Sequence, residues 1–277
     1  MAKQALRRLF SPTLGVARSE PVLAWMVRGI PWLRESRATR AGVLAFSIGF
    51  GLIAALAVAF AFSATELPVA LLLVIAGVRV VLDTATLARS WGRVGEEYRT
   101  GRWDLLRLTA QSEGALLRAH YAAAYASVWR LLLAALGAQT AATLIIMLSN
   151  FTQIARSPQS SPFAWLAAIS GITLFTVELM ARPRALVALG LALSASAPRA
   201  GSAAVLGSMA LLVFWAAQGA ALFTGFMLAS AMLWGASEEW TWLAFGIFLL
   251  PLTVDWFVQR AALYRLAVAV DARDAAV

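Results

Sequence analysis

Long apolar runs without charge alternate along the chain with short segments rich in arginine. About 20 apolar residues suffice for a helix to cross a bilayer. The runs are apolar on every side, as in LLLVIAG and ATLIIML, whereas a barrel strand alternates apolar and polar residues. Hydrocarbon requires every backbone N–H and C=O to be paired within its own segment. We therefore expect an all-α integral membrane protein.

Charged residues divide the apolar sequence into six predicted membrane helices within one transmembrane domain, 1–277. The predicted helices are 41–65, 67–88, 118–149, 162–198, 201–222 and 240–266. Residues 162–198 would measure about 55 Å as one straight helix, against a hydrocarbon core of about 30 Å. We therefore expect an irregular joint at Pro183, because proline removes a helical hydrogen bond. The uncharged stretch 200–237 is also too long, and we expect a re-entrant element over 225–234 before the last helix.

The composition supports a membrane protein. The chain is 61% hydrophobic and 13% charged, about half the charged fraction of a soluble domain, which is about 25%. A soluble enzyme and a disordered chain are excluded on this ground. A disulfide-stabilised secreted module is excluded because there is no cysteine.

Basic residues indicate the orientation. Residues 1–40 contain eight of them and residues 79–118 contain seven, whereas the connections at 63–66, 150–161 and 235–239 contain only Arg156. Loops rich in Lys and Arg face the cytoplasm. Both termini and the segment 89–117 are thus predicted to be cytoplasmic, in a bacterial inner membrane. Residues 1–38 mix basic and bulky apolar residues, which favours a helix on the lipid surface over a disordered basic tail.

The cytoplasmic segment carries a recognisable pattern, GEEYRTGRWDLLRLTAQSEGALLRAH. It resembles the signature of type-2 ATP-binding-cassette (ABC) exporter permeases, in which an acid-rich turn precedes Gly-Thr-Trp-Glu-Leu-Leu and Thr-Pro-Leu-Ser. The chain departs from the signature at Arg99, at Arg102 and at 110–111. The segments 21–44 and 188–204 resemble the family's basic surface helix and the inner end of its fourth span. The residues that correspond to the signature are Glu96, Glu97, Gly101, Trp103, Asp104, Leu105, Leu106 and Thr109.

The resemblance implies a coupling helix that docks on a separate ATPase subunit, in an assembly with a second permease copy or a homologue. From the sequence itself, Trp103, Leu105, Leu106 and Leu108 are expected to share an apolar side. The chain lacks the Gly-x-x-x-x-Gly-Lys-Ser/Thr sequence that binds nucleotide phosphates. It is therefore not expected to be an enzyme, and ATP hydrolysis would occur in the partner. The alternative is a non-transporting scaffold subunit of a larger membrane complex, and a lipid enzyme is disfavoured.

Ionisable side chains inside membrane spans are costly and suggest a function; those singled out here are Arg79, Asp83, Glu178 and Asp255. Arg79 and Asp83 are four residues apart and are expected to pair on one helix face, with a gating role as the alternative. Glu178 and Asp255 are expected to face the bundle interior, in an interhelical contact or beside Arg182 or Arg260; substrate binding is the alternative.

Other chemistry is disfavoured by what the sequence lacks. With no cysteine and one histidine, His120, the chain cannot form a Cys/His metal cluster, a Cys–His nucleophile or a bis-histidine haem site. We therefore expect no cofactor. The basic inner surface is explained by topology and by anionic lipid, so nucleic acid is not an expected partner.

Overall fold

The computed structural model describes residues 37–61, 67–91, 93–108, 113–156, 162–197, 200–233 and 249–274. Within these ranges the chain is helical, without strands, as the sequence predicts. The predicted surface helix at 1–35, Thr109 and residues 62–65 and 240–248 of two predicted spans lie outside them. The helices are α3 (Arg37–Ala61), α4 (Leu67–Ser90), α5 (Arg93–Arg99), α6 (Arg102–Arg107), α7 (Glu113–Ser127), α8 (Trp129–Arg156), α9 (Pro162–Ser196), α10 (Ala200–Leu233) and α12 (Leu250–Asp274).

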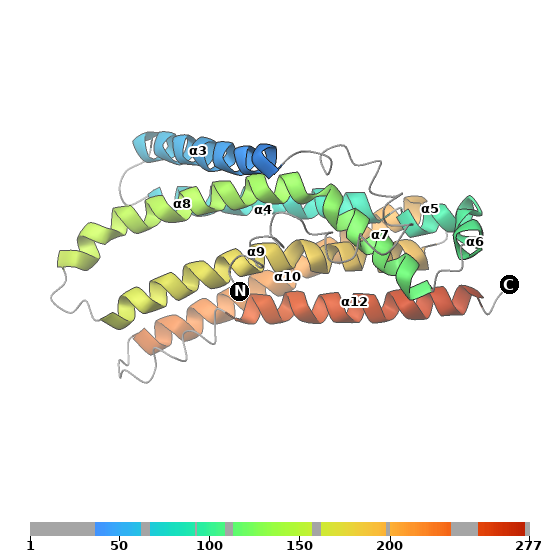
Figure 1. Cartoon of the computed structure of the whole chain (residues 1–277). Helices are drawn as coiled ribbons and strands as arrows, with labels where there is room; N and C mark the ends of the chain where they lie inside the picture. The colour runs from blue at the N-terminus through green and yellow to red at the C-terminus, as the bar shows by residue number, and fades with distance from the viewer. Residues whose placement is uncertain are drawn as a thin grey trace.

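The long helices run back and forth along one axis (Figure 1). α3 packs on α8, and α9 lies centrally, in contact with α4, α10 and α12. The short helices α5 and α6 lie at one end of the bundle, beside α7 and close to the end of α12 (Figure 1). Consecutive long segments therefore point in opposite directions, and α5 and α6 project from one end.

The predicted span 118–149 is two helices rather than one. α7 and α8 meet at Val128 with a bend of 48° between Leu116–Ser127 and Trp129–Ala142. At the bend the N–H of Val128 bonds to Tyr125 O at 3.2 Å, which is a tight 3₁₀-type turn. The Ser127 carbonyl accepts a hydrogen bond from the Arg89 guanidinium of α4. A side chain from another helix thus satisfies a backbone group at the bend.

Two sequence predictions about helix breaks are wrong. Pro183 does not interrupt α9, which runs unbroken over 35 residues with the proline inside it. The predicted re-entrant element at 225–234 is also wrong over 225–233, because these residues continue α10. An apolar helix satisfies its own backbone hydrogen bonds, so a long apolar run favours continuation over a turn.

Many large apolar side chains are exposed, and several charged side chains are buried. Large apolar side chains are exposed on α3, α4, α10 and α12; examples are Phe46, Leu73, Leu212 and Phe257. Buried charged side chains lie between the helices instead: Arg79, Asp83, Glu178, Arg182 and Asp255. By length and composition, Gly201–Thr224 is the one described helix that could cross a bilayer unaided, or one of two if the bent pair counts as a span.

Small residues allow α3 and α8 to pack closely. A Cβ placed on Gly137 would lie 2.7 Å from Ser47 Cβ, and one placed on Gly51 would lie 2.9 Å from Ala138 Cα. Real Cβ atoms do not approach other atoms this closely, so both positions require glycine unless the helices separate. The close approach fits the use of small residues at helix contacts in membranes.

Candidate functional site

The segment that resembles the exporter signature folds as a helical hairpin, residues 93–108, which we call the elbow. α5 ends at Arg99, and the chain reverses through Thr100 and Gly101 into α6. Gly101 has φ 69°, in the left-handed region that glycine adopts without strain. Its N–H bonds to Tyr98 O at 3.2 Å. Gly101 is thus the residue that makes the turn possible.

Trp103 anchors the elbow to the bundle. Its side chain is fully buried. The indole stacks on Tyr98 of α5 at a centroid separation of 4.8 Å, and on His120 of α7 at 5.6 Å. The tryptophan therefore does not face solvent; it joins α5, α6 and α7 into one unit.

The apolar side predicted for this helix is divided in two. Trp103 is buried and Leu106 is partly buried, whereas Leu105 is 64% exposed and Leu108 is 82% exposed. Residues advance by about 100° per position along a helix, so Leu105 lies on nearly the opposite side from Trp103. Asp104 and Arg102 are exposed as well. The outer face of the elbow thus combines two leucines with an acid and a base.

The two predicted coupling acids have different surroundings. Glu96 is exposed and forms an ion pair with Arg99 at 3.0 Å. Glu97 is partly buried, and its desolvation raises the pKa of its carboxyl above the ordinary value, an effect that Arg102 and Arg93 oppose. Arg99 is one of the positions at which the chain departs from the exporter signature. Its guanidinium compensates the negative charge of Glu96 within α5.

A second contact holds the elbow to α9. The N–H of Gly95 donates to Ser194 Oγ at 2.9 Å. A Cβ at position 95 would lie 2.7 Å from the Ser194 carbonyl oxygen. The sequence analysis did not single out either residue. The sequence feature that could have drawn attention to this contact is Gly95 itself, which directly precedes the acids Glu96 and Glu97 in a short helix.

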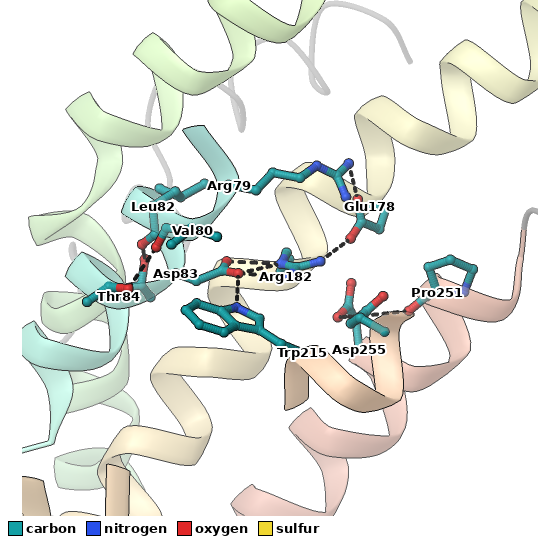
Figure 2. Close-up of polar contacts among 12 residues, drawn as sticks. Arg79, Val80, Leu82, Asp83, Thr84, Glu178, Arg182, Trp215, Pro251 and Asp255 are labelled. Atoms are coloured by element: carbon teal, nitrogen blue, oxygen red, sulfur yellow. Dashed lines mark hydrogen bonds and ion pairs between the residues drawn. The ribbon is translucent and has the colours of Figure 1, made fainter. Parts of the chain in front are cut away.

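A buried ion cluster, formed by Arg79, Asp83, Glu178 and Arg182, connects α4 and α9. The Arg182 guanidinium donates to both Asp83 oxygens at 2.8 to 2.9 Å and to Glu178 Oε1 at 3.0 Å. Arg79 pairs with Glu178 at 2.5 Å. Figure 2 shows Arg182 between Asp83 and Glu178, with Arg79 against Glu178. The expected pairing of Arg79 with Asp83 on one helix is thus replaced by ion pairs between helices.

Trp215 and Phe214 extend this cluster to α10. The indole of Trp215 donates to Asp83 Oδ2 at 2.9 Å, and Arg182 lies 5.1 Å from the centre of the Phe214 ring. Asp255 makes the expected interhelical contact, but with Gln218, whose amide donates to Asp255 Oδ1 at 2.6 Å. Arg260 instead lies over the exposed Trp256.

The sequence named Arg182 only as a neighbour expected beside Glu178 or Asp255, and did not single out Trp215 or Gln218. Arg182 follows Glu178 by four positions in an apolar stretch, a spacing that places both on one helix face. Trp215 and Gln218 gave no comparable signal. Within the described ranges, no three His, Cys, Asp or Glu side chains are placed to hold a metal ion.

Comparisons with known proteins identify no family for this chain. No protein-family model, no curated protein and no solved structure matches this chain.

Proposed function

We propose that this chain is the membrane-spanning permease subunit of an ABC-type exporter, with the outer face of the elbow as the docking surface for an ATPase subunit supplied in trans. The observation that carries the proposal is that Trp103 is buried while Leu105 and Leu108, on the same short segment, are exposed. A helix anchored on one side and apolar on the other is suited to receive a partner.

The exposed apolar surface supports placing the bundle in a membrane. Solvent exposure of Phe46, Leu212 and Phe257 is costly in water and favourable in lipid. The ion cluster lies buried between helices, which is where charged side chains inside a membrane are expected. These observations support a membrane position for α3, α10 and α12, and for the buried ion cluster between α4 and α9.

The course of the chain supports the proposed topology. α3, α4, α7–α8, α9, α10 and α12 alternate in direction, an arrangement that favours an even number of crossings (Figure 1). The elbow lies at the end where α4 and α9 finish. Because Arg89, Arg93, Arg99 and Arg102 lie at this end, we assign it to the cytoplasm of the bacterial inner membrane.

The elbow has two connections through which displacement by an ATPase would reach the bundle. One runs from Trp103 to His120 on α7, which continues through the bend into α8. The other runs from Gly95 to Ser194 near the end of α9. α9 carries Glu178 and Arg182, so motion of its end would act on the ion cluster as well.

A pull-down from native membranes tests the proposal, with Leu105→Asp as the variant and Leu212→Asn as the control. Leu105 is exposed on the elbow and Leu212 is exposed on α10. We expect an ATP-hydrolysing subunit to co-purify with the parent chain and the control and to be lost from the variant. Stable co-purification of other membrane proteins without any ATPase would contradict the proposal and favour the scaffold alternative.

A further inference from the structure

The buried charges between α4, α9 and α12 do not balance. The ion cluster contains two arginines and two carboxylates, which compensate one another. Asp255, 1% exposed, adds a third carboxyl group on α12. Arg260, on the same helix, is exposed and lies 5.7 Å from the centre of the Trp256 ring. Among the described residues the buried group therefore lacks one positive charge.

The carboxyl of Asp255 has few hydrogen-bond donors. Its Oδ1 accepts from Gln218 Nε2 at 2.6 Å, and its Oδ2 is buried without a hydrogen-bond partner in the part of the chain that the structure describes. The same Nε2 also donates to the carbonyl of Pro251, at 3.3 Å. Gln218 Oε1 is buried and lacks a partner as well. One neutral amide is thus the donor that reaches this carboxyl.

An ionised carboxylate in this position would be expensive. Burying a charge is tolerated when it is paired and hydrogen-bonded, and costly otherwise. The nearby arginine on α9, Arg182, already binds Asp83 and Glu178. Those two acids and Asp255 carry the same sign of charge, which further disfavours ionisation of the third.

We propose that Asp255 is a proton-binding site, and that the bound proton supplies the missing charge between α9, α10 and α12. Gln218 on α10 contacts its carboxyl directly, and the charged groups that act on it electrostatically are Glu178 and Arg182 on α9 and Asp83 and Arg79 on α4. A protonated carboxyl is neutral and is compatible with the close contact of α12 with α10. Release of the proton would require water at Asp255, and therefore separation of Gln218 from it.

A proton fits this site better than a metal cation. A cation such as Na⁺ requires several oxygen ligands, whereas the Gln218 amide already presents its N–H₂ group to Asp255 Oδ1 and to the Pro251 carbonyl. The proposal is independent of the assignment of an ATPase partner, since it rests on the buried charges alone.

Infrared spectroscopy of the purified full chain in lipid nanodiscs tests the proposal. We expect the C=O stretch of a protonated carboxylic acid at neutral pH, its loss in Asp255→Asn, and its retention in Asp83→Asn, the matched buried acid that is ion-paired. Absence of the band in the parent chain, or its persistence in Asp255→Asn, would overturn the assignment.

A second variant keeps the test decisive if Asp255→Asn does not fold. Gln218→Leu retains the carboxyl and removes its donor, so we expect the band to remain and to shift to higher frequency; an unchanged band would contradict the site. Thermal unfolding in sodium, potassium and choline salts at fixed pH should give equal midpoints. Stabilisation by sodium that Asp255→Asn abolishes would replace the proton with a metal cation.

Discussion

The backbone N–H of Gly95 on α5 donates a hydrogen bond to the side-chain oxygen of Ser194 on α9, at 2.9 Å. The two residues are 99 positions apart in the chain. Because the donor belongs to the backbone, the contact fixes the axis of α5 rather than one side chain. The elbow is thus tied to the end of the longest helix in the described part of the bundle.

Substitution Gly95→Ala is expected to weaken this joint. The added Cβ would lie 2.7 Å from Ser194 O, which is backbone and cannot move independently. We expect loss of stimulation of the partner's ATPase by the permease, although alanine favours a helix over glycine by about 1 kcal/mol. Gly77→Ala on α4, where nothing lies within 4 Å of the new Cβ, is the control and should retain stimulation. Equal activity of both variants would argue against the α5–α9 joint.

Substitutions at Trp103 and Leu105 are expected to have different effects, the first on stability of the elbow and the second on docking of the partner. Trp103→Ala removes a fully buried indole and should destabilise the elbow by about 3 to 5 kcal/mol. Leu105→Ala removes an exposed side chain, so thermal unfolding should stay unchanged while partner affinity falls. The two measurements are protease sensitivity of the elbow and ATPase binding. A destabilised Leu105→Ala protein would mean that this residue packs on the bundle.

The turn at Gly101 can be tested through its backbone angle. Its φ of 69° is unfavourable for alanine, with a cost of about 1 to 2 kcal/mol for a residue with a Cβ. Nothing within 4 Å would obstruct the added Cβ. Gly101→Asn should therefore lose less stability than Gly101→Ala, because asparagine tolerates this conformation. Calorimetry of both variants checks the order; equal losses would show that another property of glycine matters.

The partly buried carboxyl of Glu97 is expected to make the stability of the protein depend on pH. Burial raises the pKa of its carboxyl, so between the ordinary value and the raised value the folded state binds more proton than the unfolded state. Stability is therefore lost as pH rises through that interval. Glu97→Gln should match the parent chain below the interval and exceed it above. Glu96→Gln, at an exposed acid paired with Arg99, should not show this gain. Thermal unfolding across pH distinguishes them.

Arg182 is expected to be the residue on which the ion cluster depends. Arg182→Met leaves Asp83 without its guanidinium partner, and breaking a buried pair costs about 3 to 5 kcal/mol. Arg184→Met is the control, since Arg184 is exposed and lies over the Tyr125 ring, an interaction of about 0.5 to 1 kcal/mol. Denaturation in mild detergent should rank the two variants in this order, and a reversal would contradict the central position of Arg182.

The sequence predicted what depends on local hydrophobicity and missed what depends on neighbours in space. The helical class and most helix positions follow from apolar runs, and an interhelical contact of Asp255 follows from the cost of burying charge. The pairing of Arg79 with Glu178 does not follow, because the relative positions of α4 and α9 decide it. The continuity of α9 through Pro183 likewise does not follow from the local sequence, in which the proline predicted an irregular joint.

In the elbow, too, the local sequence predicts some features and contacts with other helices decide the rest. The helix and its turn follow from the local sequence around Gly101, but the burial of Trp103 does not. Sequence periodicity gives the angle between Trp103 and Leu105, and the position of His120 on α7 decides which of them faces inward.

Cysteine cross-linking from Leu105 tests the docking assignment most directly, because the chain contains no cysteine of its own. Leu105→Cys is introduced, membranes of the native host are treated with a thiol-specific cross-linker, and the captured partner is sequenced; Leu212→Cys on α10 is the control. The account predicts capture of a subunit with a Gly-x-x-x-x-Gly-Lys-Ser/Thr sequence that hydrolyses ATP, from Leu105→Cys alone, and labelling of that cysteine by an impermeant maleimide only from the cytoplasmic side. Labelling from the periplasm, or capture of partners without a nucleotide-binding subunit, would contradict it.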